Sequence, residues 1–184
     1  MLIFEFPTIV NDIYPIDIKN LRQHNNSMED FKTNLYVYVL IRNDLPSLTP
    51  GKAAAQVHHA GVQMISKYGH LPTVQNYVNS GKSDGADHFS TTITLSATMQ
   101  DIETAMARIK NVENCVYDIV IDPAYPFLVD PEITPFLTGN QDIEYVSSTG
   151  DKDLFTRNEL TVAWALGDKG NPIFRSAFEN LKLY

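Results

Sequence analysis

The sequence has one cysteine, Cys115, so it cannot form a disulfide within the chain. No apolar run approaches the roughly 20 residues that a membrane-spanning helix requires. The opening residues, MLIFEFPTIVND, lack the basic segment that begins a secretory signal. Together these absences favour a reducing, cytoplasmic setting and no membrane partner.

Positive charge is also scarce. The 184 residues carry 22 acidic and 14 basic side chains, which gives a formal net charge of −8. Broad binding to nucleic acid depends on neutralising phosphates with lysine and arginine. The overall charge therefore argues against a general DNA-binding role, and any contact with RNA has to come from a local basic site.

From residue 35 onward, strand patterns alternate with helix patterns. Runs rich in β-branched and aromatic residues predict four strands, which are LYVYVLIR (35–42), FSTTITL (89–95), CVYDIVI (115–121) and LTVAWAL (160–166). The first run has little alternation, which is typical of a strand buried on both faces. We predict that Cys115 and Trp164 lie in the core.

Apolar residues at helical spacing predict helices over 50–69, 73–81, 96–110 and 171–184. The first begins with the N-cap residue Thr49, and its expected buried face contains Val57, Gly61, Met64 and Tyr68. Thr98 and Asp101 have the spacing of a capping box. The order of elements predicts a three-layer α/β/α fold with a small four-stranded mixed sheet.

The chain is expected to form one domain, residues 35–184, preceded by an N-terminal extension or arm at residues 1–34. A long segment, residues 126–159, separates the third and fourth predicted strands and contains scattered proline and glycine. Connections of this length within a compact domain are usually functional lids or mobile insertions.

The stretch SLTPGKAAAQVHHAG, residues 47–61, places Lys52 in the first turn of a helix, where the helix dipole disfavours a cation by about 0.3–1 kcal/mol. Gly51 costs about 0.5–1 kcal/mol more relative to alanine. A bound anion would offset both costs, because backbone N–H groups, the dipole and the ammonium converge on it. The alternative is that Lys52 points into water. The segment is not a P-loop, since no serine or threonine follows the lysine.

The residues around this helix resemble the type II peptidyl-tRNA hydrolases. That family has a strand, an R-x-D-L turn and a helix beginning K-x-A-A-Q-x-x-H-A, and this chain reads IRNDLPSLTPGKAAAQVHHA over residues 41–60. The chain also ends in LKLY, as the family does. Its third and fourth predicted strands are similar to the family's strand that ends in an aspartate and its strand that contains T-V. The resemblance covers roughly residues 35–125 and 158–184.

The resemblance implies hydrolysis of the ester that joins a peptide to the 3′ ribose of tRNA, with no metal or cofactor and with a possible homodimer. By resemblance, Asp122 acts as a general base or orients the water, and Lys52 binds the terminal phosphate or stabilises the oxyanion. Thr161 donates a hydrogen bond to the water or to the substrate carbonyl. The remaining expected substrate-binding residues are Gly51, Gln56, His59, Arg42 and Tyr125.

Several of these residues also have plainer interpretations. Asp122 precedes Pro123 and could simply initiate a turn. Thr161 suits a strand by propensity alone, and His59 is readily interpreted as a packing or hydrogen-bonding residue. Gln56 either orients Asp122 or the water, or satisfies buried backbone groups.

The chain departs from the family around the same site. After the strand-end aspartate the family has A-G-R-T, whereas this chain has PAYP, so Tyr125 and Pro126 replace an arginine and a threonine. The following segment is rich in acids, which would repel tRNA. The alternative function is therefore a catalytically altered protein of the same fold that acts as a protein- or RNA-binding module, with residues 1–34 and 126–159 as its contacts.

Overall fold

The computed structural model describes residues 34–45, 47–80 and 90–184, so nearly all of the expected N-terminal extension lies outside the described residues. These residues form an α/β fold with six strands and five helices. Their order is β1 (Leu35–Arg42), α1 (Pro50–Tyr68), α2 (Pro72–Asn79), β2 (Thr92–Ala97), α3 (Met99–Ile109), β3 (Val116–Val129), α4 (Thr134–Leu137), β4 (Ile143–Ser148), β5 (Asp153–Asp168), α5 (Pro172–Ser176) and β6 (Lys182–Leu183).

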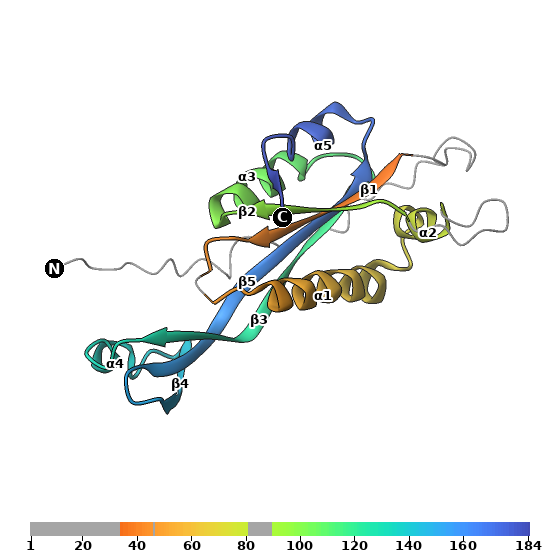
Figure 1. The fold of residues 1–184 in the computed structure, drawn as a ribbon. Helices are drawn as coiled ribbons and strands as arrows, with labels where there is room; N and C mark the ends of the chain where they lie inside the picture. The colour runs from red at the N-terminus through yellow and green to blue at the C-terminus, as the bar shows by residue number, and fades with distance from the viewer. Residues whose placement is uncertain (1–33, 46, 81–89) are drawn as a thin grey trace.

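The strands form one mixed sheet in the order β3-β5-β1-β2-β6, with β4 paired to β5 off this path (Figure 1). Strands β1 and β2 are parallel, and the other pairs are antiparallel. All four predicted strands are present, but the prediction of a four-stranded sheet is wrong. Two short strands complete the sheet because β2 and β5 have backbone edges that β6 and β4 can reach.

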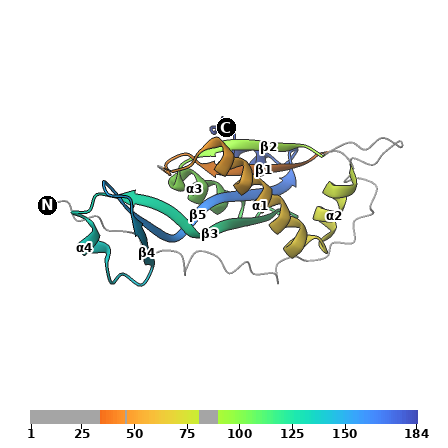
Figure 2. The same ribbon diagram turned by 60° about the horizontal axis from the view of Figure 1, so that its bottom comes forward.

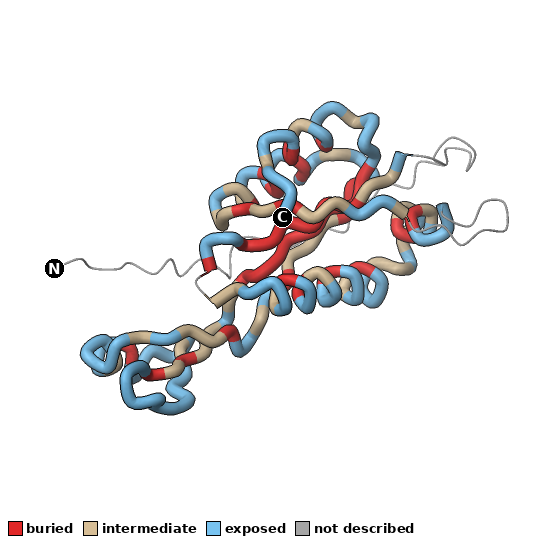
Figure 3. The backbone as a smooth tube through the Cα atoms, in the orientation of Figure 1, coloured by how far each residue is buried: buried red, intermediate tan, exposed pale blue. Residues whose placement is uncertain are grey.

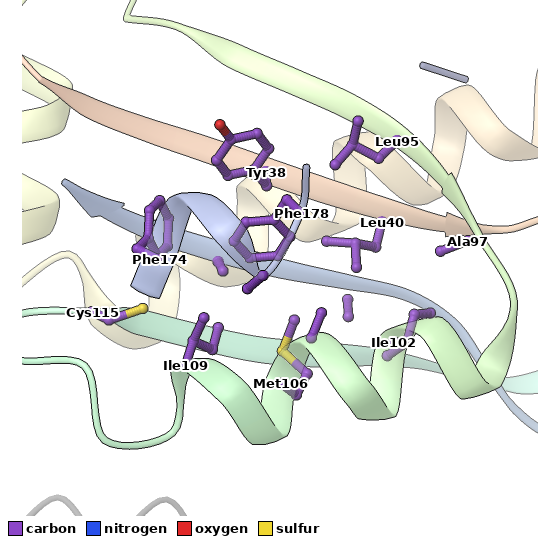
Figure 4. Packing of buried hydrophobic residues seen from close by; sticks show 14 of the residues in the cluster. Tyr38, Leu40, Leu95, Ala97, Ile102, Met106, Ile109, Cys115, Phe174 and Phe178 are labelled. Carbon is purple, nitrogen blue, oxygen red and sulfur yellow. The ribbon is translucent and has the colours of Figure 1, made fainter. Parts of the chain in front are cut away.

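Helices cover both faces of the sheet (Figure 2). In β1, Val37, Val39 and Ile41 pack with α1 and α2, whereas Tyr38 and Leu40 pack with α3 and α5. Figure 4 shows the second of these two cores, in which Phe178 stacks on Tyr38. Burial on both faces explains why the β1 sequence is apolar without alternation.

Helix α1 begins and ends where its capping residues predict. The Thr49 hydroxyl accepts the Lys52 N–H at 3.3 Å, and the helix ends before Gly69. Its buried face differs from the prediction, however, because Gly61 is exposed. The fully buried positions are Ala53, Gln56, Ala60 and Met64, whereas Val57 and Tyr68 are partly buried. Small alanines bring this helix close to the sheet. In α3 the predicted capping box of Thr98 and Asp101 is confirmed.

The predicted C-terminal helix is wrong after its first turns. Asn171 caps α5 as expected, and Phe174 and Phe178 are buried. The helix ends at Ser176, and the chain then turns so that Lys182 and Leu183 pair with β2. A helix through these residues would leave that edge of β2 unpaired, so tertiary pairing overrides the local helical spacing.

Strands β3 and β5 are much longer than predicted. Beyond Asp122 they leave the body of the sheet and form a three-stranded antiparallel sheet with β4, which α4 accompanies (Figure 1). We call residues 126–159 the ribbon. The segment expected as a lid or mobile insertion is therefore built largely from extensions of two core strands. None of the described helices has both the length and the apolar content needed to cross a membrane.

Cys115 is buried, as predicted, immediately before β3, and burial raises the pKa of its thiol to about 12. At pH 8 the reactive thiolate is then about a thousandfold scarcer than for a thiol with a pKa near 9. We expect iodoacetamide to leave the native protein unlabelled over an hour and to label it fully in denaturing urea, as measured by intact mass. Rapid labelling of the native protein would show that the Cys115 environment is open.

Candidate active site

Asp122 lies where β3 changes from the body of the sheet to the ribbon. The pairing of β3 with β5 shifts register between Val120 and Ile121, and again between Asp122 and Tyr125. Such bulges interrupt the ladder and redirect side chains, and they are common beside active sites. The half-buried Asp122 side chain is thereby directed towards α1, where Gln56 contacts it.

A chain of hydrogen bonds connects three of the predicted site residues. The Thr161 hydroxyl donates to Gln56 Oε1 at 2.7 Å, and Gln56 Nε2 donates to Asp122 Oδ2 at 3.3 Å. The other carboxylate oxygen, Oδ1, accepts the Ala124 N–H at 3.0 Å. Both oxygens of Asp122 are therefore held in place, and each retains a lone pair that can accept a hydrogen bond from water.

Lys52 lies on the same side of α1 as this chain, because it precedes Gln56 by one helical turn. Its Nζ is 5.4 Å from the centre of the Tyr125 ring, and Tyr125 follows Asp122 by three residues. The ammonium and the Asp122 carboxylate are thus positioned by adjoining parts of α1 and β3. A Cβ added at Gly51 would meet no atom within 4 Å, which leaves the start of the helix open to a ligand.

Tyr125 is itself unusual. Only 2% of the residue is exposed, and its hydroxyl has no hydrogen-bond partner among the described residues. The ring lies beneath the ammonium of Lys52. The hydroxyl is a buried polar group that a bound water or ligand could satisfy.

Two predicted substrate-binding residues, Arg42 and His59, lie outside the cluster that Lys52, Gln56, Asp122 and Thr161 form. Arg42 is 7% exposed, and its guanidinium donates to Glu159 and to the Leu160 carbonyl, each at 3.0 Å, and also pairs with Asp44. It ties β1 to β5 beside the site and has few donors left for a substrate. His59 lies on the exposed surface of α1, with no hydrogen bond to the described residues of the cluster.

The charged cluster around Arg42 is the part of the region that sequence reasoning misses. Burial raises the pKa of Asp44, but the hydrogen bond and the charge of Arg42 outweigh it, so the pKa is lowered overall. Glu159 accepts from Arg42 on one side and from Arg157 on the other. One feature of the sequence indicates this charged cluster. Arg157 and Glu159 alternate in a strand immediately before the apolar run of β5.

The complete burial of Thr161 gives this residue a different role from the one expected. Thr161 has no exposed surface, and its hydroxyl hydrogen is directed to Gln56. It therefore orients Gln56 and does not reach a substrate directly. A hollow of about 150 Å³ lies on the ribbon side of Asp122. Its lining is Pro123, Gln141, Asp142, Ile143, Glu144, Thr156, Arg157 and Asn158, so it does not include Lys52 or Thr161.

The fold and this site together define an α/β protein with an acid, an amide and a cation assembled at the start of a helix. No protein-family model and no curated protein matches the chain. Among solved structures, one similar protein is of unknown function and comes from Agrobacterium tumefaciens strain C58. The alignment covers 83% of this chain and 98% of that one, at 10% identity and a TM-score of 0.43, which is too low to establish a shared fold.

Proposed function

We propose that the chain is an esterase that hydrolyses peptidyl-tRNA, with the fold of the type II peptidyl-tRNA hydrolases. The observation that carries this proposal is the hydrogen-bonded chain from Thr161 through Gln56 to Asp122, adjacent to Lys52 at the start of α1. These four residues match the family motifs in the sequence, and three of them are joined by direct hydrogen bonds.

The proposed reaction needs a general base and a cation close together. Asp122 takes a proton from water as the water oxygen attacks the ester carbonyl carbon. Gln56 donates to Asp122, and the Thr161 hydroxyl donates to the Gln56 oxygen at 2.7 Å, which favours this orientation of the amide. The bond from the carbonyl carbon to the 3′ oxygen then breaks, and the proton passes from Asp122 to that oxygen. The products are a free peptide carboxyl group and tRNA.

Lys52 supplies positive charge where the substrate carries or develops negative charge. The ammonium would either stabilise the oxyanion or bind the phosphate of the terminal nucleotide, and the first turn of α1 would add backbone N–H groups to the same site. The first turn has no acidic side chain to compete for this site. The chain carries a formal net charge of −8, so recognition of tRNA would depend on this local patch.

The test is hydrolysis of an N-blocked aminoacyl-tRNA by the purified full-length chain. We expect turnover by the wild type and a loss of about 10–10³-fold in kcat/KM for Lys52→Ala. A loss in kcat would assign Lys52 to the oxyanion, and a rise in KM that Lys52→Arg reverses would assign it to phosphate binding.

Lys67→Ala is the matched control, because Lys67 lies in the last turn of the same helix and pairs with Asp118. Its kcat/KM should equal that of the wild type. Absence of turnover by the wild type would refute the hydrolase proposal. A filter-binding titration with tRNA at low salt would then show whether the alternative, an RNA-binding module, holds.

A further inference from the structure

The ribbon exposes an unusual amount of apolar surface. The described residues include twelve large exposed hydrophobic side chains, and five of them lie in this segment of 34 residues: Leu128, Ile133, Phe136, Tyr145 and Val146, with exposures between 45% and 83%. Figure 3 shows the ribbon as mainly exposed chain, in contrast to the buried strands of the body. This number of exposed apolar side chains makes the ribbon a candidate interaction surface.

The ribbon has a small hydrophobic core of its own, so its exposed apolar side chains are additional to a packed interior. Phe155 is 1% exposed, and the rings of Phe127 and Tyr145 lie 5.9 and 5.4 Å from it. Leu137 of α4 is also buried, and the Thr134 hydroxyl donates to the buried Asp153. The ribbon therefore has an internal core, and the half-exposed Tyr145 ring covers one side of it. The other exposed apolar side chains are Leu128, Ile133, Phe136 and Val146.

Strand β4 forms one edge of the ribbon. Within the described chain it pairs only with β5, and its residues from Glu144 to Ser148 are all exposed. The other edge of β4 leaves backbone groups without partners, which is the geometry that accepts an added strand. The β4 sequence, IEYVSS, has no proline or lysine, although the β4–β5 pairing shifts register between Tyr145 and Ser147 and leaves Val146 as a bulged residue.

The charge of the ribbon indicates the kind of strand that would fit. The ribbon has seven acidic residues and two basic ones. Lys152 pairs with Asp130, and Arg157 pairs with Glu159. The exposed acids Glu132, Asp142, Glu144 and Asp151 form no ion pair with another described residue. Asp142 and Glu144 also line the hollow of about 150 Å³ at the start of β4. Arg157 lines it too, but Arg157 pairs with Glu159, so the two acids are left to attract a further basic side chain.

We infer that the ribbon is a docking surface for a partner protein that presents an extended segment of alternating basic and apolar residues. The segment adds to the free edge of β4, its apolar side chains contact Val146 and its neighbours, and a basic side chain enters the hollow beside Asp142 and Glu144. A second copy of this chain is a poorer occupant, because two acidic ribbons would face each other. The inference does not depend on the hydrolase proposal.

The experiment measures fluorescence anisotropy of labelled ten-residue peptides against the full-length protein. The first probe alternates lysine with valine, and the controls replace its lysines with glutamate or its valines with serine. A further probe carries N-methyl groups on alternate residues, which removes backbone donors from one edge and keeps the charge. We expect the wild-type protein to bind the first probe and none of the others. We expect the Glu144→Gln/Val146→Ser variant to bind the first probe with a Kd roughly fivefold or more higher than that of the wild type. The matched control is Glu103→Gln/Val62→Ala, on the distant helices α3 and α1.

Each of the other results would overturn the inference. If the N-methylated probe binds as tightly as the first probe, the peptide does not pair with the edge of β4. If the Glu144→Gln/Val146→Ser variant binds the first probe as tightly as the wild type does, the peptide binds elsewhere. Binding by none of the probes would remove the case for a basic strand partner. Sedimentation would show whether the chain forms a dimer that Glu144→Gln/Val146→Ser abolishes, in which case a second copy would be the occupant. Circular dichroism checks that both variants are folded.

Discussion

Replacing Asp122 with asparagine is expected, under the proposed mechanism, to slow hydrolysis of peptidyl-tRNA by about 10²–10⁴-fold, because an amide cannot accept the proton that leaves the attacking water. The substitution keeps the size of the side chain, so the backbone at the bulge should not change. An initial-rate assay at saturating substrate measures the effect on kcat directly.

Asparagine also disturbs hydrogen bonding, which has to be separated from the loss of the base. The two oxygens of Asp122 accept from Gln56 and from the Ala124 backbone, and asparagine can keep only one of these contacts. The expected cost in stability is about 1 kcal/mol. Asp118→Asn is the matched control, since Asp118 is in the same strand and accepts from Lys67 and Tyr68. It should lose similar stability and retain activity. If both variants lose activity equally, Asp122 has no chemical role.

Replacing Trp164 with alanine is expected to lower the free energy of unfolding by about 3–5 kcal/mol. Trp164 has no exposed surface and lies on β5 between β1 and β3. Its ring packs against Tyr68 with the centroids 5.6 Å apart, and its Nε1 donates to Gln63 at 2.8 Å. The change creates a cavity between α1 and the sheet and leaves the Gln63 oxygen without this donor. Since domains of this kind are stable by about 5–15 kcal/mol, part of the population could unfold.

Urea unfolding followed by circular dichroism gives the size of this loss. Trp164→Phe fills most of the cavity and removes only the indole donor, so it should cost about 1–3 kcal/mol. Val62→Ala, at a position on α1 that is 53% exposed, should change stability by no more than about 0.5 kcal/mol. A Trp164→Ala variant as stable as Val62→Ala would contradict the packing of α1 described above.

The sequence predicts part of the candidate site because certain motifs have local causes. Thr49 and Pro50 define the start of α1, which places Lys52 and Gln56 one turn apart on one side of a helix. The positions of Asp122 and Thr161 follow from family resemblance and not from any local pattern. Their meeting with Gln56 depends on two strands and a helix that are distant in the chain, so only the folded structure brings them together.

Arg42 shows why the rest of the site could not be predicted. In the sequence it appears as a cation near the proposed site, available to a substrate. In the structure its guanidinium is already engaged by Asp44 and Glu159. The pair with Glu159 is largely buried, and its low-dielectric surroundings make it hard to exchange for a ligand. Glu159 is far from Arg42 along the chain, so no sequence spacing reveals the pair.

Local chemistry in the sequence alone determined the extent of β1, the two ends of α1, the capping box of α3 and the buried places of Cys115 and Trp164. Tertiary contacts decided the length of β3 and β5, the two extra strands, the short α5 and the depth of Thr161. The physical reason is that capping and propensity act within a few residues, whereas a strand continues or ends according to which distant backbone edge is free to pair with it.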